Sequence, residues 1–423
     1  MARKMKDSGI EWIGEIPEGW EVVPVRSCFD EVRTKNTDGQ EQNALQFKSG
    51  NIISKANFNA NTDDYVADTI TNYTVVLPDT VMINGLNLNY DFKSLRVALV
   101  KEKGVITSAY LAIFPDRKKI SPQYATYLFK GYETKMAFHN MGAGIRKTLG
   151  YKEFKNQPLL LPSKEEQNKI SAYLDSKCSH IDTMLFRTHS SIEEYKKLKQ
   201  AVITQAVTKG VRGEREMKDS GVEWIGEIPK EWDILNLVAH TSMLTPMRDR
   251  PENLDGPIPW IRIEDFDGKY ISSSKASLGV SKETVQSMNL KIYPVGTILC
   301  TSSCIMGKCA IVSRELVSNQ RFIGIIPDQN TCENFLYYLM LSNSERMNYL
   351  ATGALQANLS RSSFEHLKVQ FPSYQEQKEI ADYLDAKCAE IDGLIAKKEQ
   401  LVKELESYKK SLIYEVVTGK REV

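Results

Sequence analysis

Apolar residues recur at seven-residue spacing along two long polar segments of this 423-residue chain. The first segment, 164–209, contains no Gly or Pro, and it follows Ser163 with Glu166 three residues later, the pattern of a helix capping box. Its apolar positions form two rows: Leu174, Ile181, Thr188, Tyr195 and Val202, and Cys178, Leu185, Ile192 and Ala206, with Lys199 breaking the second row. Heptads sustained over this length predict a coiled-coil helix.

The second segment repeats the pattern more cleanly. Its two rows are Leu384, Ile391, Leu405 and Leu412, and Cys388, Ile395, Val402 and Val416. Lys398 and Lys409 interrupt the rows, and Gly393 lies inside the predicted helix at some cost in helix propensity. Because each helix presents one apolar stripe, the simplest partner for one helix is the other. Two ordinary amphipathic helices on separate domains are the alternative.

Two blocks of sequence occur twice. Residues 5–22 and 217–234 are identical at 13 of 18 positions and share the sequence WIGEIP. Residues 161–182 and 371–392 are identical at 12 of 22 positions and contain the starts of the two predicted helices. A repeat of about half the chain is too long for a solenoid and indicates a duplicated module.

The sequence between the repeated blocks differs between the copies. Residues 23–160 and 235–370 share few identities, which favours a constant scaffold that carries two independently changed surfaces. An old duplication whose loops drifted is the alternative. The WIGEIP blocks hold four of the five Trp, and we expect each block to pack onto its own module, with partner binding by exposed Trp as the other possibility.

The divergent segments predict an α+β fold. Short β-branched and aromatic runs bounded by Pro, Asp, Asn and Gly predict strands. In the first copy these are Tyr73–Leu77, Val81–Asn84, Arg96–Val100 and Ala109–Phe114, and in the second Ile258–Ile263, Thr297–Thr301, Cys309–Ser313 and Phe322–Ile326. A helix is predicted after each set, at Pro122–His139 and Asn334–Ala351, followed by a glycine-led polar stretch and a short apolar segment.

Composition limits the function classes. With 55 Lys and Arg against 54 Asp and Glu, the chain is not a histone-like basic binder. Residues 25–160 carry 18 basic and 13 acidic side chains, whereas 235–370 carry 13 and 12, so a basic DNA-facing surface is easier to build in the first module. No long apolar run or secretory signal is present, and the seven cysteines form no paired pattern, so we expect a cytoplasmic protein with reduced thiols and no membrane partner.

Polar loops at matching places in the two modules are the candidates for reading base edges. Asn pairs well with adenine, and Arg or Lys with guanine. The candidate DNA-binding residues of the first module are Asn84, Asn87, Asn89, Tyr90, Lys93, Arg146 and Lys147. Those of the second module are Ser302, Ser303, Lys308, Asn358 and Arg361.

Catalytic motifs are matched only loosely. Pro78-Asp79 with Asp91-Phe92-Lys93 fits the pattern of a metal-dependent nuclease, but the pattern does not recur in the second copy. The cysteines lack zinc-site spacing, and no segment has the form by which an amino-methyltransferase holds a flipped base. We therefore predict no catalytic, cofactor-binding or metal-binding residues.

Together these features resemble the specificity (S) subunit of type I restriction–modification systems. The likeness covers nearly the whole chain and is carried by the duplicated KDSGxEWIGEIPxxW openings, 6–20 and 218–232, and the P-S-x-x-E-Q-x-x-I-x-x-Y-L-D starts, 162–175 and 372–385. It implies two strand-rich target-recognition domains, each reading half of a bipartite double-stranded DNA target, in a pseudo-two-fold arrangement. Two long antiparallel helices would join them as a coiled-coil spacer that sets the gap between the half-sites. The corresponding boundaries are 1–160 and 213–370 for the recognition domains and 161–212 and 371–423 for the spacer helices.

The resemblance also implies partners. Two methyltransferase subunits would dock on the constant regions and translocase/nuclease subunits would join for restriction, with S-adenosylmethionine, ATP and Mg²⁺ bound by those partners and no cofactor in this chain. The chain itself would then be a non-catalytic DNA reader. A metal-dependent nuclease and a coiled-coil scaffold that never touches DNA are the alternatives.

Overall fold

The chain folds into two compact units. The computed structural model describes residues 3–48, 50–55, 70–92, 95–141, 147–246, 250–303, 307–351 and 359–423. The first unit comprises Met1–His189 with Gln400–Val423, and the second comprises Ser190–Glu399. This division passes through both long helices, so each unit contains one half of each helix. It groups the chain differently from the four segments expected from sequence, and the boundaries at 160, 212 and 370 stay a prediction.

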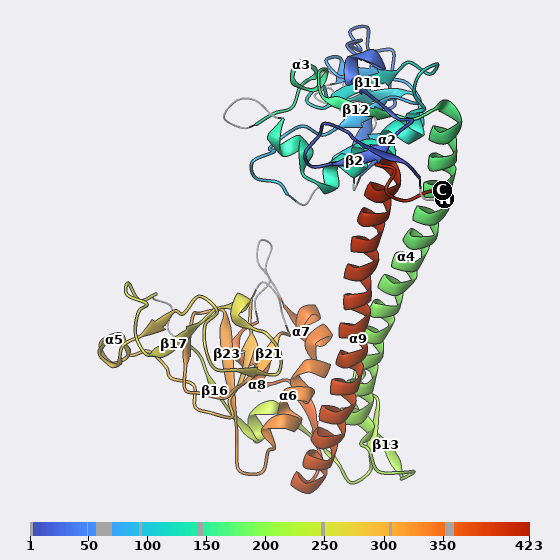
Figure 1. Ribbon diagram of the computed structural model, residues 1–423. Helices are drawn as coiled ribbons and strands as arrows, with labels where there is room; N and C mark the ends of the chain where they lie inside the picture. The colour runs from blue at the N-terminus through green and yellow to red at the C-terminus, as the bar shows by residue number, and fades with distance from the viewer. Residues whose placement is uncertain are drawn as a thin grey trace. The chain divides into compact units, whose positions relative to one another are not determined.

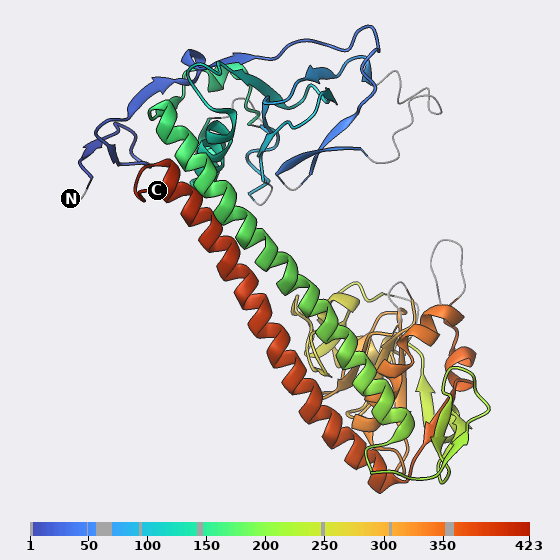
Figure 2. The same cartoon turned by 90° about the vertical axis from the view of Figure 1, so that its right-hand side faces the viewer.

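The two long helices are confirmed. Helix α4 spans Lys164–Lys209, and α9 spans Tyr374–Val417. Each begins with the predicted capping serine: Ser163 Oγ accepts from Glu166 N at 3.3 Å, and Ser373 Oγ from Glu376 N at 3.4 Å. Helix α4 ends at Gly210, whose φ of +75° favours glycine. Within each unit the halves of α4 and α9 lie side by side (Figures 1 and 2).

The heptad rows form the seam between these helices. Leu174, Cys178 and Ile181 are buried in the first unit, and Leu384 and Cys388 are buried in the second.

The lysines that interrupt the rows reach acidic or aromatic residues of the other helix. Lys409 Nζ lies 2.5 Å from Asp182 Oδ1 in the first unit, and Lys199 Nζ lies 2.6 Å from Asp392 Oδ2 in the second. These ion pairs link early residues of one helix to late residues of the other, which makes the pairing antiparallel.

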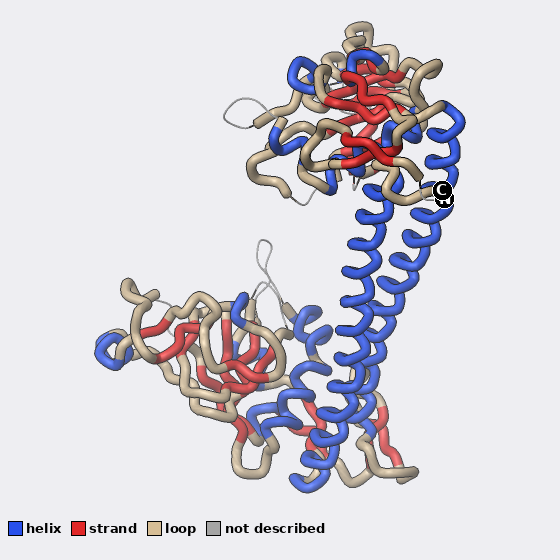
Figure 3. The backbone as a smooth tube through the Cα atoms, in the orientation of Figure 1, coloured by secondary structure: helices blue, strands red, loops and turns tan. Residues whose placement is uncertain are grey.

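The same four-stranded antiparallel sheet occurs in both units. In the first unit its order is β4 (Phe29–Glu31), β11 (Leu111–Pro115), β8 (Val81–Ile83) and β9 (Val97–Leu99). In the second unit the order is β16 (Thr241–Leu244), β23 (Phe322–Pro327), β20 (Ile298–Thr301) and β21 (Cys309–Val312), with β18 (Tyr270–Ile271) added parallel to β21. Strand order is thus kept where sequence identity is low. The mixture of helix and strand in both units confirms the α+β prediction (Figure 3).

Alternation along these strands produces two apolar faces. In the first unit Val81, Ile83 and Ile113 pack with α2 (Pro122–Thr134), while Met82 and Ala112 face a smaller cluster on the other side. In the second unit one face packs with α6 (Glu333–Ser342), again through alternate residues.

Smaller elements complete each unit. Those of the first unit are strand pairs β1–β2 (Met5–Asp7, Glu15–Pro17), β3–β12 (Glu21–Pro24, Pro158–Leu161), β5–β6 (Leu45–Lys48, Asn51–Ser54) and β7–β10 (Thr74–Val76, Gly104–Ile106), with α3 (Tyr151–Phe154) and the 3₁₀ turns η1 (Val25–Ser27) and η2 (Ala137–Asn140). Those of the second unit are β13–β14 (Met217–Asp219, Glu227–Pro229), β15–β24 (Asp233–Asn236, Lys368–Phe371) and β19–β17–β22 (Gly279–Val280, Ile258–Ile261, Val317–Ser318), with α5 (Lys282–Ser287), α7 (Ser344–Leu350), α8 (Arg361–Glu365), η3 (Leu237–Ala239) and η4 (Ile263–Asp265).

The prediction of one continuous helix after each sheet, at Pro122–His139 and Asn334–Ala351, was wrong in extent. The first ends at Thr134 because Met136 adopts a left-handed φ of +52°, and a 3₁₀ turn follows it. The second is broken at Asn343, whose side-chain amide donates to Leu339 O at 2.8 Å and so takes up a carbonyl near the helix end. Among the described residues, no helix is long and apolar enough to cross a membrane.

Candidate nucleic-acid interface

The structure brings the two predicted polar loops of the first unit together. Leu149 N donates to Gly85 O at 2.9 Å, and Leu88 N donates to Lys147 O at 3.3 Å, so the loop after β8 lies against the segment that follows the glycine-led stretch. Gly85 permits this approach, since a Cβ there would lie 2.5 Å from Leu149 O. The candidates Asn84, Asn87, Asn89 and Tyr90 on one side and Lys147 on the other therefore share one surface.

A buried arginine holds this loop in shape. Arg96 is 1% exposed, and its guanidinium donates to three backbone carbonyls: Asn84 O at 2.9 Å, Leu86 O at 2.9 Å and Asp91 O at 2.5 Å. Its backbone N donates to Glu133 Oε1 on α2 at 2.5 Å. Sequence reasoning missed this role, although a single Arg opening an otherwise apolar strand was a usable signal.

Burial also changes the chemistry of the carboxylate beneath the loop. Desolvation raises the pKa of Glu133 to about 7, against the lowering effect of its hydrogen bond from Arg96 and of nearby positive charge.

Aromatic side chains extend from the loop. Tyr90 is 74% exposed and Phe92 is 57% exposed, and Phe92 stacks on His139 with ring centroids 5.1 Å apart. His139 Nε2 lies 3.1 Å from Asp91 O, so the 3₁₀ turn η2 supports the loop from below. The first unit therefore presents an ordered loop with an amide, a phenol and an exposed Lys147 on one surface.

The second unit repeats the arrangement with different side chains. Leu359 N donates to Ser302 O at 2.9 Å, the counterpart of the bond between Leu149 and Gly85. Lys308 is exposed, whereas Ser303 is only 7% exposed and Arg361 is already paired with Glu365 at 2.6 Å. Gly307 lies against Ser344 at the start of α7, so a helix supports this loop as well.

Three candidates, Lys93, Arg146 and Asn358, lie outside the described residues. For the other nine, the structure shows where the side chains lie but does not test DNA contact, and their roles stay predictions.

The repeated sequence motifs form a second cluster, which joins each long helix to its unit. Trp20 Nε1 donates to Glu166 Oε2 at 3.0 Å, and Trp232 Nε1 donates to Glu376 Oε2 at 3.1 Å. Both Trp are 1% exposed, so each repeated block packs onto its own module through this residue, whereas Trp224 of the second block is 43% exposed.

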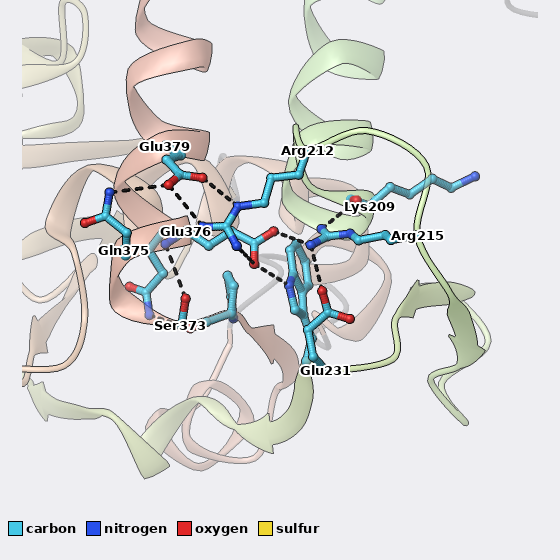
Figure 4. A network of polar contacts seen from close by, with 11 residues as sticks. Lys209, Arg212, Arg215, Glu231, Ser373, Gln375, Glu376 and Glu379 are labelled. Carbon is cyan, nitrogen blue, oxygen red and sulfur yellow. Dashed lines mark hydrogen bonds and ion pairs between the residues drawn. The ribbon is translucent and has the colours of Figure 1, made fainter.

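Arginines complete the carboxylate cluster. Arg3 pairs with Glu166, and Arg215 pairs with Glu376 at 2.6 Å. Figure 4 shows the second copy, in which Arg212 also reaches Glu379 at 2.7 Å.

The next residue of the motif ties the long helix to the helix behind the sheet. Gln167 accepts from Ser121 N at 2.7 Å, just before α2, and Gln377 accepts from Cys332 N at 2.8 Å, just before α6. These bonds occur at equivalent places in both units. The repeated sequence at the start of each long helix is therefore explained by its contact with the helix that packs on the sheet.

The carboxylates of the nuclease-like pattern have structural partners. Asp79 Oδ2 lies 2.7 Å from Arg117, and Asp91 Oδ2 lies 3.7 Å from Arg96. Within the described part of the chain, no group of three or more His, Cys, Asp or Glu side chains is arranged to hold a metal ion.

Comparisons with known proteins identify the class of fold. Residues 233–404 match the family described as type I restriction modification DNA specificity domain. A solved chain from work on complex assembly and conformational transition of the type I R-M system has a TM-score of 0.72 at 13% identity, covering 96% of this chain and 99% of that chain. The HsdS subunit from Thermoanaerobacter tengcongensis has a TM-score of 0.51 at 14% identity, covering 96% and 98%. At these identities the solved structures show the fold alone.

Curated relatives extend the match along the chain. The MjaVIII specificity subunit of a type I restriction enzyme from Methanocaldococcus jannaschii is 24% identical over 426 residues, 96% of this chain and 93% of that protein. The MjaIX specificity subunit from the same organism is 34% identical over 181 residues, 41% of each chain. Over nearly its whole length this chain is therefore similar to specificity subunits of type I restriction enzymes, and the matched family domain lies in its second half.

Proposed function

We propose that this chain is a specificity subunit of a type I restriction–modification system, in which each unit reads one half of a bipartite double-stranded DNA target. The observation that carries the proposal is the repeated pair of loops: the bonds Leu149–Gly85 and Leu359–Ser302 join equivalent loops above equivalent sheets, while the side chains on those loops differ. Two domains that recognise different half-sites need the same loop backbone with different side chains, because base choice depends on which donors and acceptors the loop presents.

The constant parts have a different role in this proposal. The repeated helix junctions and the two long helices carry the features shared by both copies, and we assign to them the docking of two methyltransferase subunits, with translocase/nuclease subunits joining for restriction. S-adenosylmethionine, ATP and Mg²⁺ belong to those partners, and this chain contributes recognition without catalysis. A cytoplasmic location is part of the same proposal.

The test is made on the assembled methyltransferase complex by sequencing the methylated sites of a genome. Lys147→Ala should relax or weaken recognition at one half-site and leave the other unchanged. Lys308→Ala should relax or weaken recognition at the other half-site only, because the two residues lie in different units. Loss of one good base contact costs about 1–3 kcal/mol of discrimination.

Lys118→Ala is the matched control for Lys147→Ala. Lys118 is exposed in the same unit. Because Ile113 pairs with Val81, β11 ends beside the start of β8, and Lys118 therefore lies at the other end of the sheet from the loop that follows β8. If Lys118→Ala and Lys147→Ala act alike, or if either loop variant alters both half-sites, the assignment of one reader to each unit is wrong.

Activity assays distinguish the two alternatives, a nuclease and a scaffold that does not touch DNA. DNA cleavage by the purified chain in the presence of Mg²⁺, abolished by Asp91→Ala, would favour a nuclease. A complex that methylates DNA with no sequence preference would favour a scaffold.

A further inference from the structure

Two buried cysteines face each other across the hairpin of the second unit. Cys300 on β20 pairs in register with Cys309 on β21, and their Sγ atoms lie 2.7 Å apart. Both are free thiols, with exposed fractions of 0% and 5%. The hairpin loop that they delimit contains Ser302, Ser303 and Lys308.

The backbone geometry at this pair suits a disulfide. Thr301 N donates to Lys308 O at 2.9 Å, so the next pair down the hairpin, Cys300 and Cys309, occupies a non-hydrogen-bonded position. Opposed Cα atoms at such positions are about 4.5 Å apart, within the span of about 4.4–6.8 Å that disulfides bridge. The strand register therefore places the two backbones within the span that a disulfide can bridge.

We propose that Cys300 and Cys309 form a reversible disulfide when the chain meets a small-molecule disulfide such as glutathione disulfide. The Cys309 thiolate attacks one sulfur of glutathione disulfide, which forms a mixed disulfide and releases one glutathione. The Cys300 sulfur then attacks the Cys309 sulfur, which breaks the mixed bond and releases the second glutathione. Two protein thiols are oxidised, glutathione disulfide is reduced to two thiols, and the two thiol protons end on the released glutathione.

Burial makes the reaction slow and selective. Desolvation raises the pKa of the Cys300 thiol, which makes it the poorer first nucleophile and assigns the first attack to Cys309, the more exposed of the two. In the second step Cys300 gives up its proton as it attacks, and that proton ends on the departing glutathione. In the first unit the equivalent opposed pair is Ile83 and Val97, so the reaction is confined to the second unit.

The bond would fix the base of one recognition loop. Ser302 O anchors Leu359 N, and Gly307 lies against Ser344, so the loop that the disulfide closes touches the other elements of the candidate interface. A restrained loop changes reading by the second unit only, a consequence that rests on the proposed function.

The test uses the full chain alone, incubated in buffers of graded glutathione to glutathione disulfide ratio, alkylated, and digested with trypsin without reduction. Trypsin cleaves after Lys291, Lys308 and Arg314, so the disulfide joins peptide 292–308 to peptide 309–314. Because the longer peptide also contains Cys304, the measurement is made in a Cys304→Ser background.

The expected result is the joined peptide pair, increasing with the fraction of glutathione disulfide, reversed by dithiothreitol, and lost in Cys300→Ser and in Cys309→Ser. Cys332→Ser, a change at another buried cysteine of the same unit, should retain it. Fully alkylated thiols at the highest glutathione disulfide ratio would overturn the proposal, as would a stable mixed disulfide on Cys309 or bonding to a different cysteine. This result does not depend on DNA, so it is independent of the half-site test.

Discussion

Arg96 links the interior of the first unit to its candidate interface. Replacing it with Met keeps much of the volume but leaves the carbonyls of Asn84, Leu86 and Asp91 without their donor. We expect Arg96→Met to lower the free energy of unfolding by about 3 kcal/mol, since each unsatisfied buried group costs about 1–3 kcal/mol. Amide exchange over 84–91 and urea unfolding measure the effect.

Arg117→Met is the control for this change. Arg117 is 58% exposed and pairs with Asp79, so its loss should cost below about 1 kcal/mol. Unchanged amide exchange over 84–91 in Arg96→Met would contradict the role given to Arg96.

Glu133 makes the stability of the first unit depend on pH. Its folded pKa of about 7 lies above the ordinary value of 4.5, so the folded chain holds this proton more tightly than the unfolded chain. The stabilisation is fully present below pH 4.5 and is lost as pH rises through 7, a change on the order of 3 kcal/mol.

Glu133→Gln keeps an acceptor for Arg96 N and removes the titration. The variant should therefore lose less stability than the parent between pH 5 and pH 8, as followed by thermal unfolding. Parallel curves for parent and variant would show that Glu133 does not titrate in this range.

At the scale of the element, two helical glycines have opposite surroundings. Gly393 lies inside α9, and a Cβ there would meet nothing within 4 Å, whereas a Cβ on Gly131 of α2 would lie 2.6 Å from Val417 Cγ2. Gly393→Ala should stabilise the chain by about 1 kcal/mol through helix propensity alone. Gly131→Ala should destabilise it, because α2 and the end of α9 would have to separate. Urea unfolding compares the two, and equal effects would contradict this account.

Sequence predicted the elements better than their ends. The heptad rows and capping serines give α4 and α9 directly, because both signals are local. The break at Met136 was not predicted, since a left-handed methionine has no sequence signature. The candidate site was predicted as two loops per module, but the bonds that join them run between residues about 60 positions apart, as from Leu149 to Gly85, and no pattern along the chain shows such pairing.

At the scale of the whole molecule, α4 and α9 each contribute to both units. We propose that the paired helices also set the gap between the two half-sites. Inserting one heptad into each helix, at matched positions, should then change the tolerated gap and leave both half-site sequences unchanged. Seven helical residues add about 10 Å, or about 3 base pairs of DNA. Sequencing of methylated sites measures the gap. The same gap after a folded, active insertion would show that the helices do not set it.

The first unit is assembled from both ends of the chain, whereas the second is one continuous stretch. Trp20 and the early part of α4 share a core with Leu412 and Val416, which a ribosome makes almost 400 residues after Trp20. During synthesis the second unit can therefore be completed first, while residues 1–189 of the first unit still lack the end of α9 that covers their apolar surface. A chain that ends at residue 399 would consequently keep the second unit whole and expose the uncovered core of the first unit to chaperones.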